Sequence, residues 1–136
     1  VSGSARGHRV WEDEHTLIFM DLFPASDGHT LLIPKPHWEN LFETPADRLE
    51  TIIGLSKPVA EALKNVFEPD GLGVFQLNGA AAGQTVFHYH MHLIPRMHGM
   101  PMHIHGRRKA DRDELQRQAE SIRAALPASM PTGFAL

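Results

Sequence analysis

Residues 84–95, Gln-Thr-Val-Phe-His-Tyr-His-Met-His-Leu-Ile-Pro, contain three histidines, each separated from the next by one residue. These histidines are His88, His90 and His92. Alternate side chains of a β-strand point to opposite faces of a sheet, so a strand over residues 86–95 would present three imidazoles on one face. Its other face would carry Tyr89, Met91 and Leu93. This stretch therefore predicts a strand with a buried apolar side and a histidine side.

Upstream of this stretch, extended patterns precede a helical one. Residues 10–20 are rich in β-branched and aromatic side chains around an acidic turn at 12–14, which predicts a hairpin ending at Asp21. Residues 29–34 predict a third strand that prolines stop, too apolar to keep one face in water. A fourth strand is predicted over 72–78, followed by a tight loop of small residues at 79–83.

Two helices complete the predicted fold. Thr44 as N-cap and Pro45 at the first helical position start a long helix with an apolar stripe, and Pro58 inside it predicts a kink. Asp111 and Glu114 have the spacing of a second helix start. The order β-β-β-α-β-β-α predicts an α+β fold with a five-stranded, mostly antiparallel sheet and one long and one C-terminal helix.

Composition limits the other possibilities. The 136 residues, 42% of them hydrophobic, predict one domain over 1–136, with residues 1–8 as a flexible end. A net charge of -3 argues against binding a nucleic acid polymer, which depends on many Lys and Arg contacts to phosphates. The absence of cysteine excludes disulfides and thiolate metal sites. No apolar run approaches the roughly 18 residues of a membrane helix, so we expect no membrane partner and a cytoplasmic location.

Three interpretations of the histidine row are open. A lone histidine such as His8 is most simply a half-buried side chain, but three on one face would each need a partner at a cost in stability. A zinc site is the second interpretation, although no third ligand of another type lies near in sequence. Catalysis at phosphorus is the third, because imidazole can act as nucleophile and as proton donor. The loop before the row favours the third, since backbone N–H groups beside Gly83 can approach an anion closely.

The sequence resembles the histidine triad (HIT) superfamily of nucleotide-binding hydrolases and transferases, in particular its bacterial members. Residues 88–94 match the alternating histidine signature of that superfamily. Its other blocks are similar to Asp21 with His29 eight residues later, to residues 32–37 and to residues 78–86. The resemblance covers about 10–95, and residues 96–136 form a variable C-terminal segment with a helix.

The resemblance implies an enzyme that forms a nucleotidyl-histidine intermediate and releases a nucleoside monophosphate such as AMP. His90 would be the nucleophile, attacking the α-phosphate of a phosphoramidate, a dinucleoside polyphosphate or an acyl adenylate. His92 would contact the phosphate oxygens and assist the leaving group, and His88 and His29 would complete the histidine cluster. A nucleotide-sensing scaffold with negligible turnover is the alternative, which the intact His90 disfavours.

The resemblance also implies the nucleotide-binding residues and the assembly. Asp21 would accept hydrogen bonds from the ribose, Leu22 would line the base pocket, and Asn78 would support the loop or the phosphate. Residues of the loop would hold the phosphate: Gly83, Gln84, Thr85 and Val86. A homodimer is implied, with a purine nucleotide as its substrate and with no metal and no cofactor. In many relatives the residue matching His37 binds a structural zinc together with the first triad histidine, here His88, and two N-terminal cysteines. The lack of cysteine predicts that this zinc is absent. His98, His103 and His105 are expected to be loop residues that reach the leaving group without a catalytic role, and a surface metal patch is the alternative.

Overall fold

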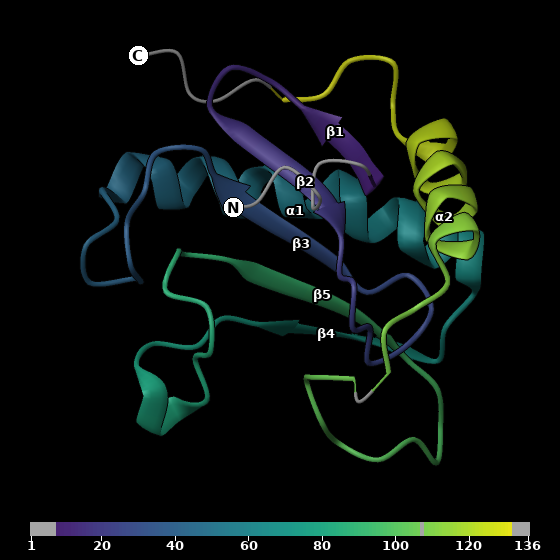
Figure 1. Ribbon diagram of the computed structural model, residues 1–136. Helices are drawn as coiled ribbons and strands as arrows, with labels where there is room; N and C mark the ends of the chain where they lie inside the picture. Colours follow the sequence, from purple (N-terminus) through teal and green to yellow (C-terminus); the bar gives the residue numbers. More distant parts are fainter. Residues whose placement is uncertain (1–7, 107, 132–136) are drawn as a thin grey trace.

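The computed structural model describes residues 8–106 and 108–131. Its strands form one antiparallel sheet in the order β1-β2-β3-β5-β4 (Figure 1). Their bounds are β1 (Arg9–Glu12), β2 (Thr16–Met20), β3 (Thr30–Pro34), β4 (Gly71–Phe75) and β5 (Met91–Arg96). The other elements are α1 (Ala46–Phe67), α2 (Arg112–Ala125) and a short 3-10 turn, η2 (Ala80–Ala82). The predicted α+β class, strand number and order of elements are confirmed.

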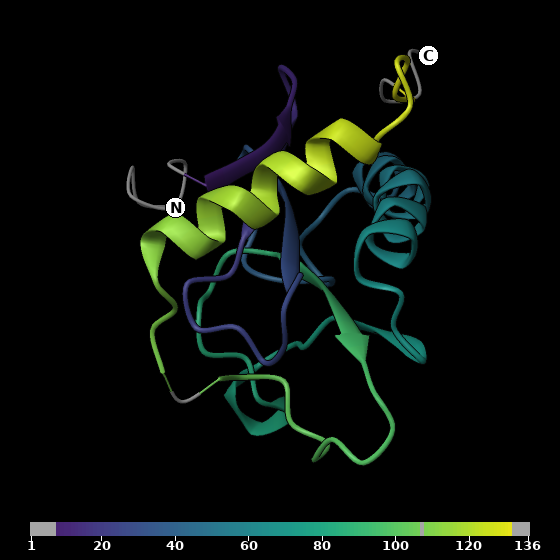
Figure 2. The ribbon, with the colours of Figure 1, turned by 90° about the vertical axis from the view of Figure 1, so that its right-hand side faces the viewer.

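Both helices pack on the same face of the sheet and form the main core with it (Figures 1 and 2). The sheet contributes alternate residues, among them Ile18, Met20, Leu32, Met91 and Leu93. The facing helices contribute apolar residues at helical spacing, among them Ile52, Leu55, Val59, Leu63, Leu115 and Ile122. These periods of two and 3.6 are those that the sequence predicts for the strands and helices.

The opposite face of the sheet is also apolar along β2 and β3. Leu17, Phe19 and Ile33 form a second buried cluster, against which Leu31 packs. His92 belongs to this face, because β5 pairs it with Leu31 on one side and Phe75 on the other. A sheet with two apolar faces needs cover on both, and helices supply it on one only. The second face is therefore the place where the fold leaves room for a ligand.

The strand predicted over residues 86–95 is wrong at its start. β5 begins at Met91, so His88 and His90 precede the strand and only His92 lies within it. Three imidazoles on one face of one strand is therefore an incorrect description of the histidine row.

The end of strand pairing explains this difference. The ladder between β3 and β5 stops at the pair Leu32 and Met91. Beyond it, the carbonyl of Pro34 accepts a hydrogen bond from His88 Nε2 (2.7 Å), so a side chain takes the place of a ladder contact. The histidine row thus begins in an extended segment and enters the sheet at its last member.

The fourth strand is also shorter than the predicted range 72–78, because β4 ends at Phe75. The side chains of Gln76 and Asn78 hydrogen-bond each other, at 2.8 and 2.9 Å. Asn78 Oδ1 also accepts a hydrogen bond from the Leu41 N–H (2.8 Å). These local bonds replace strand pairing and tie the loop after β4 to the segment before α1.

The start of α1 corrects the predicted cap by one residue. Pro45 is the N-cap and the helix begins at Ala46, without a side-chain cap. The Thr44 hydroxyl instead donates to the carbonyl of Asn40 within the preceding turn (2.7 Å). The helix continues through Pro58 as one element.

The second helix starts as predicted. Asp111 is its N-cap, and an oxygen of the Asp111 side chain accepts a hydrogen bond from the Glu114 N–H (3.0 Å). Three apolar residues of this helix are buried on the core: Leu115, Ala119 and Ile122.

Of the predicted flexible end, residues 1–7 lie outside the described part of the chain, and His8 is buried. In the ranges 8–106 and 108–131, no helix has the length and apolar character needed to cross a bilayer.

Candidate active site

A cavity of about 560 Å³ lies on the sheet face that the helices leave uncovered. Its apolar wall comes from β2, β3 and the connection after β2: Phe19, Leu22, Phe23, Leu31 and Ile33. Its polar wall consists of Asp21, His88, His90, His92 and His105, and the loop residues Thr85, Val86 and Gly106 complete the lining. An apolar slot that meets a cluster of polar side chains is the usual form of a small-molecule site.

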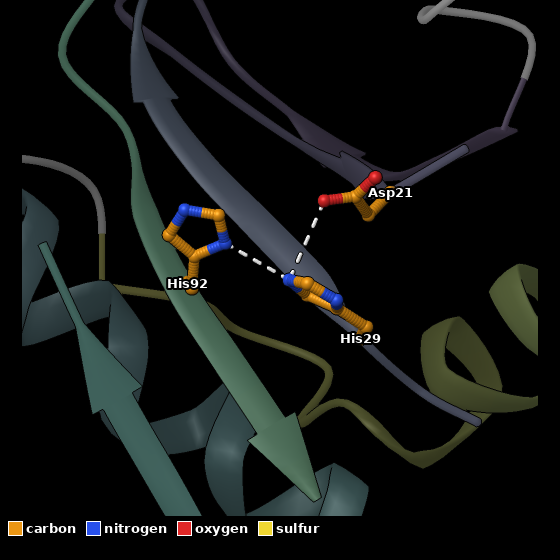
Figure 3. Close-up of side chains that lie close together, drawn as sticks. All are labelled: Asp21, His29 and His92. Carbon is orange, nitrogen blue, oxygen red and sulfur yellow. Dashed lines mark hydrogen bonds and ion pairs between the residues drawn. The ribbon is translucent and has the colours of Figure 1, made fainter. Parts of the chain in front are cut away.

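The spacing of Asp21 and His29 has a direct structural reason. The Asp21 N–H donates to the carbonyl of His29 (3.0 Å), so the two residues continue the β2–β3 pairing at the loop end of the hairpin. The side chains therefore lie side by side on the cavity face, and Asp21 Oδ2 is 3.4 Å from His29 Nε2 (Figure 3). The eight-residue separation is the length of the connection between these strands.

Hydrogen bonds determine which ring nitrogens of His29 and His92 carry protons. The Ala25 N–H donates to His29 Nδ1 (2.9 Å), so the proton of a neutral His29 must be on Nε2. His29 Nε2 lies 2.9 Å from His92 Nδ1 and donates to it (Figure 3). A neutral His92 then carries its proton on Nε2, which is buried and has no partner among the described residues. This N–H is a donor available to a ligand.

Burial keeps both of these rings neutral. It lowers the pKa of His29 to about 3, and the nearby His105 and His90 lower the pKa further in the same direction. Burial also lowers the pKa of His92 to about 3, with His90, His29 and His105 acting in the same sense. Burial raises the pKa of Asp21, although the hydrogen bond from the Phe23 N–H and the charges of His105 and His90 oppose this. At neutral pH the rings of His29 and His92 therefore form an uncharged pair of donors.

His90 is held in the complementary tautomer. Its Nδ1 lies 2.7 Å from the carbonyl of His88, and a carbonyl can only accept, so Nδ1 carries the proton. The lone pair of His90 is therefore on Nε2. The His90 ring lies edge-on to that of His92, with centroids 4.8 Å apart. His90 is thus prepared as a nucleophile beside a hydrogen-bond donor.

His88 joins the site from its back. Its Nε2 donates to the carbonyl of Pro34, so its Nδ1 accepts from His37 Nδ1 (3.2 Å). Burial lowers the pKa of His88, the bond to Pro34 raises it, and the charges of His37 and His90 lower it. His88 therefore positions the backbone carbonyl that orients His90.

The loop before the histidine row contributes only part of what the sequence predicts. Thr85 and Val86 line the cavity. The Gln84 side chain is committed to the loop: its Oε1 accepts from the Gly79 N–H (2.7 Å), and its Nε2 donates to the carbonyls of Glu39 (2.7 Å) and Val86 (3.1 Å). Gln84 thus shapes the loop and does not face the cavity.

Asn78 and Gly83 have similar supporting positions. Asn78 bonds Gln76 and Leu41 and is not among the described residues that line the cavity. Gly83 closes η2 with a φ of 103°, a conformation that glycine adopts without strain, and its N–H donates to Ala80 (3.0 Å). The structure therefore brings together the histidines, Asp21, Leu22, Thr85 and Val86, and places the other predicted residues behind the loop.

Sequence reasoning did not single out His105 from His98 and His103, and it identified only Leu22 of the apolar wall. His105 is one of three histidines in an irregular segment, and its spacing carried no signal of its own. The apolar wall left a signal in β2 and β3, where residues of both faces are apolar. A half-buried strand alternates apolar with polar side chains, so an apolar second face indicates a further packing surface.

The side chains of Asp21, His29 and His92 are close enough to be considered as a metal site, with donor atoms within 4.8 Å of one another. The 2.9 Å between His29 Nε2 and His92 Nδ1 is a hydrogen-bond distance. Two nitrogens on one tetrahedral zinc, at about 2.0–2.1 Å from the ion, would be roughly 3.3 Å apart. These residues thus fit a shared proton better than a shared ion.

The lowered pKa values predict a destabilisation in acid. Unfolded histidine binds a proton near its ordinary pKa of 6.5, whereas folded His29 and His92 do so only near 3. The free energy of unfolding is therefore expected to fall as the pH decreases from 6.5 towards 3, and to be retained above 6.5. Urea unfolding at pH 7 and 4.5 measures this, with His29 accounting for at most about 3 kcal/mol.

The variant His29→Gln isolates this contribution from the titration of other groups. It is expected to lose less stability than the wild type between these pH values, whereas His103→Ala, an exposed control, is expected to follow the wild type. The raised pKa of Asp21 acts in the opposite sense, lowering stability as the pH rises above 3.8. Identical pH dependence in His29→Gln and wild type would contradict the assignment.

Comparison with known proteins finds a matching family model and similar structures. A model of the HIT domain matches residues 2–99. The protein Hit of Bacillus subtilis is 44% identical over 96 residues, which are 71% of this chain and 66% of the relative, slightly less than two thirds of its length. A Hit-like protein from Bartonella henselae has a similar structure, with a TM-score of 0.80 at 41% identity, over 87% of this chain and 85% of that one. A hypothetical histidine triad nucleotide-binding protein from Sulfolobus tokodaii gives a TM-score of 0.79 at 33% identity, over 87% and 82%. The chain belongs to the HIT domain family.

Proposed function

We propose that this chain is a nucleotidyl hydrolase or transferase that works through a nucleotidyl-histidine intermediate at His90. The observation that carries the proposal is the 2.7 Å contact between His90 Nδ1 and the carbonyl of His88, which leaves the lone pair on Nε2. In the first step Nε2 attacks the α-phosphorus and the bond to the leaving group breaks. In the second step water attacks the same phosphorus, the P–N bond breaks, and a nucleoside monophosphate such as AMP is released.

The cavity offers a place for each part of a nucleoside monophosphate. The apolar wall around Phe19 and Leu31 suits a flat purine base, and Asp21 can accept hydrogen bonds from ribose hydroxyls. The unpartnered Nε2–H of His92 supports a contact to a phosphate oxygen, together with backbone N–H groups of Thr85 and Val86. The description of the Sulfolobus tokodaii relative as a nucleotide-binding protein supports the same ligand class.

Every step of this chemistry is assigned to a side chain or to water, so the proposal needs no metal or cofactor. The family resemblance extends the proposal to a homodimer, and a cytoplasmic location is part of the proposal. The substrate is a nucleotidylated small molecule, namely a phosphoramidate, a dinucleoside polyphosphate or an acyl adenylate.

Incubation of the wild-type protein with an adenosine phosphoramidate tests the proposal. Chromatography is expected to show catalytic release of AMP, and an acid-labile phosphorus label is expected on the protein when the reaction is stopped during turnover with base. AMP binding by calorimetry without turnover would instead favour a nucleotide-sensing scaffold. If the protein neither bound AMP nor released it, both functions would be refuted.

A further inference from the structure

His105 is the one imidazole of the cavity that lies outside the alternating histidine row and the β2–β3 hairpin. It comes from the connection between β5 and α2 and lines the cavity. Its ring lies edge-on to His92, with centroids 5.9 Å apart and an interplanar angle of 78°. It also lies close enough to Asp21, His29 and His92 for a charge on its ring to affect the pKa of each of them.

The segment after His105 is fastened to the cavity wall. The Gly106 N–H donates to the carbonyl of Phe23 (3.0 Å), and the Ala110 N–H donates to the carbonyl of Leu22 (2.9 Å). A Cβ atom on Gly106 would lie 2.0 Å from the carbonyl oxygen of Pro24, so only glycine permits this approach. His105 is therefore held at the cavity rim by its neighbours and is not on a free loop.

The proposed reaction needs a proton that the buried histidines are poorly suited to supply. A departing amine or alkoxide must be protonated as its bond to phosphorus breaks. His29 and His92 are buried and neutral at neutral pH, so each could give up a proton only by becoming an anion. The Nδ1 proton of His90 is held in a hydrogen bond to the carbonyl of His88. His105 differs from all three because it is exposed to solvent, from which it can be reprotonated in each cycle.

We propose that His105 is a further catalytic residue, the general acid that protonates the leaving group. This inference rests on the proposed function. In the first step His90 Nε2 bonds to phosphorus, the bond to the leaving group breaks, and the proton moves from the His105 imidazolium to the leaving atom. In the second step neutral His105 takes a proton from the attacking water, the hydroxide oxygen bonds to phosphorus and the P–N bond breaks.

Leaving groups of different basicity test this role. The wild type, His105→Ala and His105→Gln would be compared on an adenosine N-alkylphosphoramidate, whose amine must be protonated, and on adenosine 5′-(4-nitrophenyl) phosphate, whose phenolate leaves unaided. Both variants are expected to lose on the order of 100-fold in kcat/KM on the phosphoramidate and to stay within about threefold of wild type in kcat/KM on the nitrophenyl ester, because kcat/KM reports only the steps through departure of the leaving group. A residue that only positions the loop would affect both substrates equally.

His103→Ala is the matched control, because His103 is an exposed histidine of the same segment and does not line the cavity among the described residues. It is expected to resemble the wild type on both substrates, and melting temperatures would establish that all variants are folded. Equal losses on both substrates, or none on either, would overturn the role of His105. Failure of the wild type to release AMP from either substrate would refute the proposed function itself, a result distinct from these.

Discussion

Replacement of His90 by alanine is expected to lower AMP release from an adenosine phosphoramidate by on the order of 10⁴-fold or more. The substitution removes the Nε2 lone pair, so phosphorus must be attacked directly by water. The neighbouring donor of His92 would remain, which is why some acceleration over the uncatalysed reaction should persist. Steady-state rates and the loss of the covalent phosphorus label would measure the effect.

His90 is only partly buried, so its removal is not expected to unfold the protein. AMP affinity by calorimetry should change little, because Asp21 and the apolar wall remain. His98→Ala provides a control outside the cavity lining, since His98 lies exposed beside Asp70. Equal activity in His90→Ala and wild type would show that the nucleophile is another group.

Replacement of Ile52 by alanine is expected to lower the free energy of unfolding by about 2–5 kcal/mol. Ile52 lies in α1 with 1% of its surface exposed and belongs to the main core cluster. Truncation removes apolar contacts and leaves a cavity that close-packed neighbours can fill only in part. Urea unfolding at one low protein concentration would measure the change.

The neighbouring residue supplies the control. Ile53 is in the same helix and is 53% exposed, so Ile53→Ala is expected to change stability by less than about 0.5 kcal/mol. Comparable losses in the two variants would contradict the orientation of α1 on the sheet.

Side-chain periodicity explains why much of this fold could be predicted from sequence. The alternation around Met91 and Leu93 identifies the buried side of β5, and the helical stripe that contains Ile52 identifies the core side of α1. The sequence showed Asp21 and His29 only as two residues at a fixed separation, and only the resemblance to a family indicated that they belong to one site. The hairpin then shows that the spacing reflects two cross-strand neighbours.

The parts that sequence could not predict depend on long-range contacts. The start of β5 is set by where β3 stops pairing, which the alternating pattern before Met91 does not reveal. The internal role of Gln84 depends on the carbonyl of Glu39, 45 residues away in the chain. His105 reaches the cavity because Gly106 packs against Pro24, a contact between segments with no shared periodicity.

The two apolar faces of β2 also link ligand binding to the stability of the folded protein. The helices cover Ile18 and Met20 permanently. Phe19 faces the other way and lines the cavity that a ligand would fill. A nucleoside bound in this cavity would bury the apolar side chains of the second sheet face for as long as it stayed bound. Only the folded chain has this binding site. A free ligand concentration of 100 times the dissociation constant would therefore raise the free energy of unfolding by about 2.7 kcal/mol. The cellular lifetime of the protein would then rise and fall with the supply of its own substrate.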